Sequence, residues 1–454
     1  MTFFEELKER GLVKDIAGDE QVVADLINNG NITFYWGTDP TSSSLHIGHY
    51  SSLVTAKRLY KYGHKPILLV GGATGLIGDP KPGSEREIIS YERLNSNLEG
   101  IKKQVSKIFN NEVLVVNNYD WIKEFDYINF LRDVGKYINV NYLLDKDIIR
   151  RRLETGITYA EFSYNLIQGY DFLHLYEKHN CLFQIEGSDQ WGNITTGIDL
   201  IKKKLGKEAY AFTMPLVLDS NGQKFGKSEG NALWLDLNKT SSYKLYQYLL
   251  NSDDNIVESY LKIFTFLSLD EIKDIMIKHN REPHLRLAQK TLASEFVRDL
   301  HGEEELQKAL KLSEILFTGK FINLSKEDIE EIFDKNMIID VDNNIPLIDL
   351  LIQMQIASSK REAKEFITGN SISINGEKIT DLEYNIDDNN FIDNTYIIIK
   401  KGKKNYYIGR KKYYHIKYNE KEVERDKKEY NLILDEKIKD IIRSKQQKTK
   451  NKIF

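Results

Sequence analysis

The sequence has little cysteine and proline and lacks any long apolar run. It contains one cysteine, Cys181, and seven prolines. A single cysteine excludes an internal disulfide framework and a cysteine-rich metal site. No apolar stretch approaches the length of a membrane-spanning helix. The first residues, MTFFEELKERG, carry three Glu and predict an acidic amphipathic helix, which fits neither a secretory nor a mitochondrial targeting signal. We therefore expect a cytoplasmic protein with no membrane partner.

Charge is distributed unevenly along the 454 residues, whose formal net charge is −4. Residues 400–454 contain 19 Lys or Arg against 8 Asp or Glu, so the preceding part of the chain is acidic. A basic end on an acidic body suggests contact with a polyanion at that end. A solvated, lysine-rich tail explains the same composition, and charge alone leaves both interpretations open.

The first half of the chain alternates short apolar runs with helical patterns. The apolar runs predict strands at 32–37, 65–72, 113–117 and 181–187. Amphipathic patterns predict helices at 47–62, 91–109, 158–179 and 190–205. This alternation predicts an α/β fold with a Rossmann-like, doubly wound parallel sheet that binds ligands at the carboxyl ends of its strands.

Changes in pattern divide the whole chain into five predicted segments. These are a Rossmann-like catalytic domain at 1–235, a helical domain at 236–330, a linker at 331–344, a small α+β domain at 345–412 and a basic extension at 413–454. Within the α+β domain, Asn375-Gly376 predicts a tight hairpin. Ser358 is the expected N-cap of the second of two helices there.

The segment Tyr35-Trp-Gly-Thr-Asp-Pro-Thr-Ser-Ser-Ser-Leu-His-Ile-Gly-His49 is the first candidate site. A strand is expected to end at its glycine, and a helix to begin near His46. A helix start offers backbone N–H groups to a phosphate. His46 and His49, three residues apart, project from one face, and Gly48 leaves room for a planar ring. This predicts a nucleotide site; a surface pair or half of a zinc site is the alternative, and we predict no protein-bound metal because no further Cys/His cluster supports one.

The second candidate site is Lys224-Phe-Gly-Lys227-Ser228. Two lysines around a glycine form a cationic loop that can close over a triphosphate. The pattern is weak alone, because lysine and glycine are common in exposed turns. Its place about 175 residues after His49, following the predicted strands and helices of the doubly wound sheet, makes it informative.

Together these motifs resemble the HIGH and KMSKS signatures of class I aminoacyl-tRNA synthetases, and the first 235 residues resemble the bacterial-type tyrosyl-tRNA synthetases almost continuously. The resemblance implies a tyrosine–tRNA ligase that works as a homodimer. Such an enzyme activates L-tyrosine with ATP and Mg²⁺, releasing pyrophosphate, and transfers tyrosine to the 3′ end of tRNA(Tyr). It also implies that five residues meet the charge of the reaction: Thr41, His46, His49, Lys224 and Lys227.

A tyrosine pocket is expected from two further segments. Gly71-Gly-Ala-Thr-Gly-Leu-Ile-Gly-Asp79-Pro80 is glycine-rich but has neither a P-loop nor a dinucleotide signature. Tyr164, Gln168 and Asp171 share one face of the helix predicted at 158–179; a solvated face is the alternative, disfavoured by the apolar residues around it. The resemblance places Asp79, Tyr164 and Gln168 around the substrate ammonium, Asp171 and Tyr35 at its phenolic hydroxyl, and Gln190 on its carboxyl side. Phenylalanine would leave the buried carboxylate of Asp171 unpaired, which is unfavourable.

The remaining site residues follow from the same resemblance. The implied ATP contacts are Gly37, Asp39, Gly48, Lys81, Arg86, Gly187, Asp189 and Ser228, with Gly187 and Asp189 at the ribose. The sequence departs from the family pattern at Trp36 and Thr38, where many relatives carry a small residue and an aromatic one, and in the loop 80–86, which is one residue shorter.

The segment 345–412 resembles the small RNA-binding domain shared with ribosomal small-subunit protein S-four. The resemblance rests on SSKREAKEFI and on ITGNSISINGEKI. In this comparison Lys360, Arg361 and Lys364 face RNA phosphates from one helix.

Three alternatives remain. A tryptophanyl enzyme has the same architecture, but Asp171 with Tyr35 suits a phenol better than an indole. An enzyme that joins tyrosine to something other than tRNA is disfavoured by the RNA-binding segment. A non-catalytic RNA-binding protein descended from a synthetase is disfavoured by the intact histidines and lysines.

Overall fold

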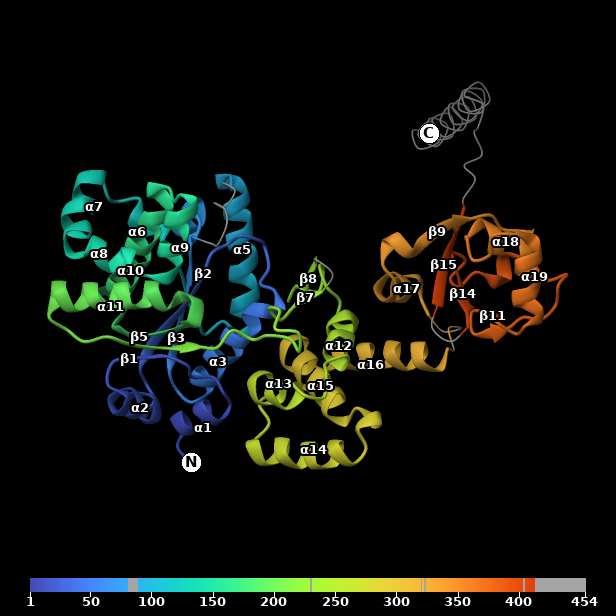
Figure 1. The fold of residues 1–454 in the computed structure, drawn as a ribbon, viewed down its shortest axis with the longest axis horizontal. Helices are drawn as coiled ribbons and strands as arrows, with labels where there is room; N and C mark the ends of the chain where they lie inside the picture. The colour runs from blue at the N-terminus through green and yellow to red at the C-terminus, as the bar shows by residue number, and fades with distance from the viewer. Residues whose placement is uncertain (81–88, 229–230, 320, 322–323, 403–404, 413–454) are drawn as a thin grey trace, which may run out of the picture. The chain divides into compact units, whose positions relative to one another are not determined.

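The computed structural model describes residues 1–80, 89–228, 231–319, 321, 324–402 and 405–412. The predicted basic extension, 413–454, lies outside these residues. The chain forms two compact units, Met1–Thr318 and Gly319–Phe454, and each is described by itself (Figure 1). Within the described ranges no helix combines the length and apolar character needed to cross a membrane.

A six-stranded sheet forms the centre of the first unit. Its strands are β1 (Ile16–Ala17), β2 (Thr33–Thr38), β3 (Lys65–Val70), β4 (Leu114–Asn117), β5 (Cys181–Gly187) and β6 (Tyr210–Met214). They lie in the order β1-β6-β5-β2-β3-β4, and all neighbours are parallel except β1 and β6. The predicted α/β fold class is confirmed, and the four predicted strands match β2, β3, β4 and β5. Strands β1 and β6 were not predicted from the sequence.

Helices cover both faces of this sheet. The helices that precede β5 in the chain are α1 (Phe3–Glu9), α2 (Glu20–Asn29), α3 (Tyr50–Lys61), α4 (Gly72–Ile77), α5 (Tyr91–Ile108), α6 (Tyr119–Ile122), α7 (Tyr127–Asp133), α8 (Val140–Leu144), α9 (Asp147–Thr155) and α10 (Tyr159–His179), and α11 (Trp191–Leu205) follows β5. Parallel crossovers are right-handed. Because the chain moves from β2 to β3 in one direction and from β5 to β6 in the other, α3 and α11 lie on opposite faces (Figure 1).

The helices α10 and α11 pack closely on each other, and this fixes the face of α10 that meets the sheet. A Cβ on Gly197 would lie 2.9 Å from the Cβ of Phe172, so a glycine is needed where the helices approach. Phe172 and Leu173 of α10 join Tyr35 and Ile67 of the sheet in one buried cluster. The burial of these apolar side chains stabilises the arrangement.

The sheet opens between β2 and β5. Strand β2 pairs with β3 as far as Thr38, opposite Val70, but its pairing with β5 ends at Tyr35, opposite Gln184. From β2 the chain continues to β3 on one side of this gap, and from β5 it continues to β6 on the other side. The gap is therefore the topological switch point, where doubly wound sheets bind ligands.

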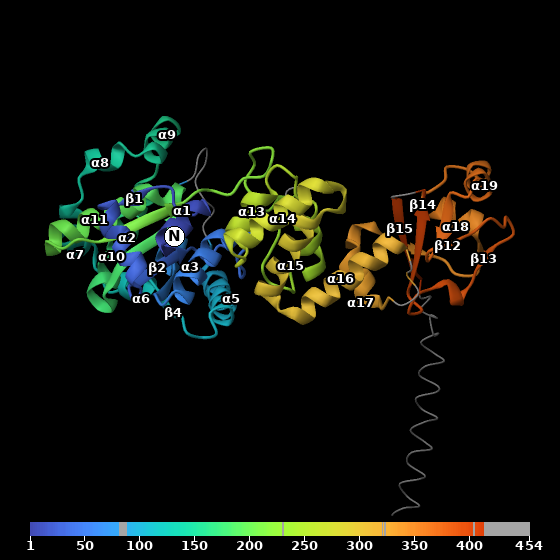
Figure 2. The same ribbon diagram turned by 90° about the horizontal axis from the view of Figure 1, so that it is seen from below.

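Five helices complete the first unit: α12 (Ser242–Leu250), α13 (Val257–Phe264), α14 (Leu269–Arg281), α15 (Leu287–His301) and α16 (Glu303–Thr318). They gather beside the sheet (Figure 2). The side chain of Tyr50, at the start of α3, packs against Phe264 and Phe296, with ring centroids 6.0 and 4.1 Å away. Its hydroxyl donates to Asp299 at 2.8 Å. The helical region is thus attached to the helix that follows His49.

The second unit is a small α+β structure. Its elements are α17 (Lys326–Ile332), β9 (Ile338–Val341), β10 (Ile345–Pro346), α18 (Leu347–Gln353), α19 (Lys360–Thr368), β11 (Ile372–Ile374), β12 (Glu377–Lys378), β13 (Asn385–Ile386), β14 (Tyr396–Lys401) and β15 (Asn405–Lys411). Five strands form a sheet in the order β12-β11-β14-β15-β9. The predicted linker, 331–344, is wrong in part, because β9 pairs in parallel with β15. The first unit ends at Thr318, whereas the predicted helical domain ran to residue 330.

Two local predictions in this unit have different outcomes. The hairpin is confirmed: Asn375 and Gly376, with φ of 48° and 96°, connect β11 to β12, as a tight turn requires. The N-cap prediction was wrong by one residue. Ser359 caps α19 by accepting the Glu362 N–H, whereas the Ser358 N–H and hydroxyl bind the Glu362 carboxylate at 2.6 Å.

Candidate active site

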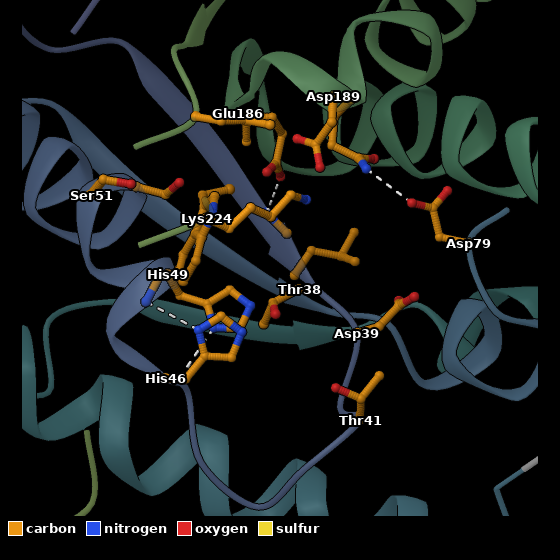
Figure 3. Close-up of a pocket in the computed structure, with 18 of the residues that line it drawn as sticks. Thr38, Asp39, Thr41, His46, His49, Ser51, Asp79, Glu186, Asp189 and Lys224 are labelled. Atoms are coloured by element: carbon orange, nitrogen blue, oxygen red, sulfur yellow. Dashed lines mark hydrogen bonds between the residues drawn. The ribbon is translucent and has the colours of Figure 1, made fainter. Parts of the chain in front are cut away.

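Most of the predicted site residues surround one cavity of about 480 Å³ at the split between β2 and β5 (Figure 3). Those that line it are Tyr35, Gly37, Asp39, Thr41, His46, Gly48, His49, Asp79, Tyr164, Gln168, Asp171, Gly187, Asp189, Gln190 and Lys224. Trp36 and Thr38, the departures from the family pattern, also line it. The cavity therefore brings together segments that are far apart in the sequence.

Four predicted residues cannot be placed as side chains. Lys81 and Arg86 lie outside the described residues. Lys227 and Ser228 form the strand β7 (Lys227–Ser228), which pairs with β8 (Asn231–Ala232), but their side chains lie outside the described structure.

One end of the cavity contains the buried carboxyl of Asp171. Its Oδ2 accepts from Asn118 Nδ2 at 2.9 Å, and its Oδ1 accepts from Trp121 Nε1 at 2.8 Å. Burial raises the pKa of Asp171 to about 7, although both hydrogen bonds act to lower it. Tyr35 is only 2% exposed, and its hydroxyl has no well-formed hydrogen bond among the described residues. A buried acceptor and a buried hydroxyl at one end suit a ligand hydroxyl.

Two series of hydrogen bonds line the cavity, and one of them begins at Asp171. In the first, Asn118 donates to Thr74, Thr74 donates to Asp39 at 2.7 Å, and Tyr164 donates to the other oxygen of Asp39 at 3.0 Å. Asp39, predicted as an ATP contact, is therefore held against the glycine-rich segment. A Cβ on Gly71 would lie 2.1 Å from an Asp39 oxygen, so this contact requires glycine.

The second series joins three predicted tyrosine-binding residues. Gln168 donates to the Gln190 oxygen at 3.3 Å, and Gln190 donates to Asp79 Oδ2 at 3.0 Å. Asn193 also donates to Gln190, at 2.8 Å. The amides thus hold a carboxylate at the cavity wall, where it can accept from a ligand ammonium.

His46 and His49 also line the cavity, and their rings are in contact, with centroids 3.8 Å apart and an interplanar angle of 31°. His46 Nδ1 accepts from the Gly48 N–H at 3.1 Å, and His49 Nδ1 accepts from the His46 N–H at 3.2 Å (Figure 3). Desolvation, with a smaller contribution from His46, lowers the pKa of His49 to about 3, so its ring is neutral at pH 7. Since each Nδ1 accepts, a proton on a neutral ring resides on Nε2. The pair therefore supplies N–H donors to the cavity.

The segment 224–228, here called the lysine loop, is fixed by Phe225, which is 4% exposed. Its ring lies 4.9 to 5.4 Å from those of Tyr248, Tyr260 and Phe264. The next N–H, of Gly226, donates to the Tyr248 hydroxyl at 2.9 Å. Gly226 has a φ of +87°, and a Cβ there would lie 2.1 Å from the Ile47 side chain. The loop thus packs directly against the helix start between the two histidines, and Lys224 reaches the cavity.

Several residues that line the cavity or support its wall were not singled out from the sequence. Thr74, Asn118 and Trp121 complete the surroundings of Asp39 and Asp171. Glu186 is a buried acid on the cavity wall. Two signals were present: Asn118 follows a predicted strand directly, and Glu186 is an acid inside an apolar strand pattern.

Among the residues that the structure describes, no group of three or more His, Cys, Asp or Glu side chains is placed to hold a metal ion. In the second unit, Lys360, Arg361 and Lys364 lie exposed on α19. Lys360 pairs with Asp349 at 2.9 Å and Arg361 with Glu365 at 3.2 Å. Such exposed ion pairs are weak.

Comparison with known proteins identifies the family. Residues 27–318 match the family described as class I tRNA synthetases (W and Y), and residues 328–409 match the C-terminal domain of the SYY-like tyrosine–tRNA ligases. The tyrosine–tRNA ligase of Streptococcus pyogenes serotype M3 is 47% identical over 416 residues, which cover 90% of this chain and 99% of that protein. The enzyme of Streptococcus suis is 45% identical with the same coverage.

A solved structure agrees with these matches. The C-terminally truncated mitochondrial tyrosyl-tRNA synthetase of Aspergillus nidulans has a TM-score of 0.63 and 32% identity, covering 70% of this chain and 94% of that one. The first family spans tryptophanyl and tyrosyl enzymes, but the C-terminal match and the named relatives are tyrosyl. The chain therefore belongs to the tyrosine–tRNA ligases, enzymes of the class I aminoacyl-tRNA synthetases.

Proposed function

We propose that this cavity activates L-tyrosine with ATP and that the resulting tyrosyl group is then transferred to the 3′ end of tRNA(Tyr). The observation that supports this most strongly is the meeting of the histidine pair, Lys224 and the Asp171 end in one cavity. The hydroxyl-binding end suits the phenol of tyrosine, and the acidic wall suits its ammonium. The N–H donors suit the reacting phosphates of ATP.

In this proposal the tyrosine phenol donates to Asp171 and faces the hydroxyl of Tyr35. The ammonium binds Asp79, with Tyr164 and Gln168 beside it, and Gln190 lies on the carboxyl side. The carboxylate then attacks the α-phosphorus of ATP and pyrophosphate leaves. Holding both reactants in one orientation supplies much of the rate enhancement, so no covalent intermediate with the enzyme is needed.

The nucleotide occupies the other half of the cavity, along Gly37, Gly48, Gly187 and Asp189. Negative charge that develops on the phosphates is met by the Nε2–H groups of the histidines, by Thr41 and by the lysine loop. Lys81, Arg86, Lys227 and Ser228 complete the predicted set. Mg²⁺ supplies further charge neutralisation and, as is usual for this ion, is held mainly by substrate phosphates and water.

The test is tyrosine-dependent exchange of pyrophosphate into ATP by the purified chain with Mg²⁺. We expect exchange with tyrosine and far less with phenylalanine or tryptophan. Absence of exchange, or equal exchange with tryptophan, would contradict the assignment. A Lys224→Ala variant should bind tyrosine normally and exchange slowly, which separates charge stabilisation from substrate binding.

The second unit is proposed to contact tRNA through Lys360, Arg361 and Lys364. Their exposure on one helix, and the weak ion pairs of Lys360 and Arg361, support this role. Reversing all three charges to Glu should lower tRNA affinity and weaken its dependence on salt, while exchange stays unchanged. Glu substitution of three exposed lysines in the first unit, Lys14, Lys65 and Lys207, serves as the matched control.

We also propose that the chain is a cytoplasmic homodimer. Large apolar side chains are exposed on α7 to α10, including Tyr127 (62%), Ile128 (70%), Val140 (56%) and Tyr159 (62%). Exposed apolar residues gathered on neighbouring elements mark interaction surfaces. Ile128→Glu should shift the mass measured by light scattering toward a monomer, and Leu285→Glu, at an exposed apolar residue in the helical region, should not.

A further inference from the structure

Glu186 is a buried acid in the split of the sheet that no predicted role uses. It lies next to the end of β5, is 6% exposed and lines the cavity. Its Oε1 accepts the N–H of Gly37 on β2 at 2.5 Å (Figure 3). Backbone pairing between these strands has already ended at Tyr35 and Gln184. The side chain therefore replaces a backbone acceptor at the point where the strands separate.

This position is where a doubly wound sheet receives its ligand. A Cβ on Gly37 would lie 3.2 Å from Glu186 Oε1, so a glycine lets the carboxyl approach the strand. One carboxyl oxygen is used by this contact. The carboxyl group as a whole remains on the cavity wall, with further hydrogen-bonding capacity for a ligand.

The electrostatic surroundings favour a neutral carboxyl. Burial raises the pKa of Glu186 well above its usual value, and the charges of Asp189, Asp39 and Asp79 add to this, although the Gly37 N–H acts in the opposite direction. A neutral carboxylic acid has one O–H donor as well as acceptor capacity. It can therefore form hydrogen bonds with a hydroxyl, which both donates and accepts.

The neighbours of Glu186 restrict the ligand group further. In Figure 3 its carboxyl lies beside that of Asp189 and away from Asp79. Asp189 follows Gly187, where a Cβ would lie 2.7 Å from its Oδ1, so this acid is held against the end of the same strand. Two adjacent acids, one of them neutral, suit a pair of neighbouring hydroxyls better than a phosphate.

We infer that Glu186 binds a ribose hydroxyl of the nucleotide, beside Asp189, and so contributes to the choice of ribonucleotide. The inference rests on the proposed function, because it takes ATP to be the ligand of this half of the cavity. Glu186 is thereby a substrate-binding residue, and its bond to Gly37 orients its carboxyl. The competing explanation is purely structural: Glu186 joins the two strands and touches no ligand.

The experiment compares ATP with 2′-deoxy-ATP and 3′-deoxy-ATP in tyrosine-dependent exchange, for the unchanged chain, Glu186→Ala and Glu186→Gln. We expect Glu186→Ala to lower kcat/KM for ATP about tenfold, the effect of one lost hydrogen bond. For the analogue that lacks the bound hydroxyl, Glu186→Ala should leave kcat/KM almost unchanged. ATP and this analogue should therefore have similar kcat/KM values in Glu186→Ala, whereas the unchanged chain should prefer ATP. Glu186→Gln keeps an acceptor for Gly37 and a donor for the ribose, and should restore most of the preference.

Equal losses for ATP and both analogues would overturn the inference and leave the structural explanation. The inference would also be overturned if the unchanged chain had the same kcat/KM for ATP as for both analogues. Equilibrium binding of the three nucleotides to the same proteins gives a second measurement that does not require turnover. If exchange is absent but binding still shows the Glu186-dependent preference, the proposed reaction fails and the ribose contact stands. Tyrosine affinity, which should not change, controls for a damaged fold.

Discussion

Replacement of Asp171 by asparagine should narrow the preference for tyrosine over phenylalanine. The carboxylate has two acceptor oxygens, and each already receives a hydrogen bond, from Asn118 and Trp121. The proposed phenol contact adds a third donor. An amide of the same shape has one acceptor oxygen and no charge, so it cannot satisfy these donors equally well.

The magnitude follows from the change in the hydrogen bond to the phenol. A hydrogen bond to a charged group contributes about 1.5–3 kcal/mol and one between neutral groups about 0.5–1.5 kcal/mol. The substitution should therefore weaken this bond by about 1–2 kcal/mol, which lowers kcat/KM for tyrosine roughly 5- to 30-fold. Phenylalanine has no hydroxyl to lose and gains relative to tyrosine, since an unpaired amide is less unfavourable than an unpaired carboxylate.

Pyrophosphate exchange with each amino acid measures the two values of kcat/KM, and a thermal melt checks that the variant is folded. Trp121→Phe is the matched control, because it removes one donor to Asp171 but keeps the carboxyl. It should reduce the preference less than Asp171→Asn does. The assignment of Asp171 is refuted if Asp171→Asn lowers kcat/KM for tyrosine and for phenylalanine by the same factor, since equal losses indicate general damage to the cavity.

Three further predictions concern separate parts of the molecule. Below the Asp171 pKa of about 7 the carboxyl becomes neutral and a weaker acceptor. Tyrosine affinity should therefore fall with decreasing pH, by at most about tenfold per pH unit. The tyrosine affinity of Asp171→Asn should not depend on pH in this range, and an affinity of the unchanged chain that rises on acidification would contradict the reasoning. Tyr248→Phe removes the acceptor of the Gly226 N–H and should lower the exchange rate about fivefold without changing tyrosine affinity; unchanged kinetics would show that this bond does not position the loop. A chain ending at Thr318 should retain exchange but lose tRNA charging, and loss of exchange would show that the two units depend on each other.

Local patterns were sufficient for the central part of the fold. Strands such as β3 are buried on both faces and therefore appear as continuous apolar runs, and the amphipathic helices have a clear periodicity. The strand β1 has two residues, and its pairing with β6 joins distant parts of the chain, so no local pattern encodes it. The same limit applies to β9, which becomes a strand only because β15 pairs with it. Adjacent serines at 358 and 359 are equally good caps, and the contact with Glu362 decides between them.

The candidate site divides in a similar way. Residues within short motifs, such as His46 and Lys224, could be predicted to share one cavity because each motif is visible in the local sequence. Asn118 and Trp121 belong to a strand end and a short helix whose approach to Asp171 depends on packing across the sheet. Their role could not be inferred from their neighbours in the sequence.

The helical region packs against both the segment after the histidine pair and the lysine loop. Phe225, which follows Lys224 in the lysine loop, packs against aromatic rings from α12 and α13. One of those rings, Phe264, also packs against Tyr50 at the start of α3, directly after His49. The histidine pair and the lysine loop are therefore held by one aromatic cluster that neither motif contains. Since packed cores resist small displacements, a change of volume at Phe264 should disturb both motifs together, which explains how segments so far apart in the sequence keep a fixed geometry.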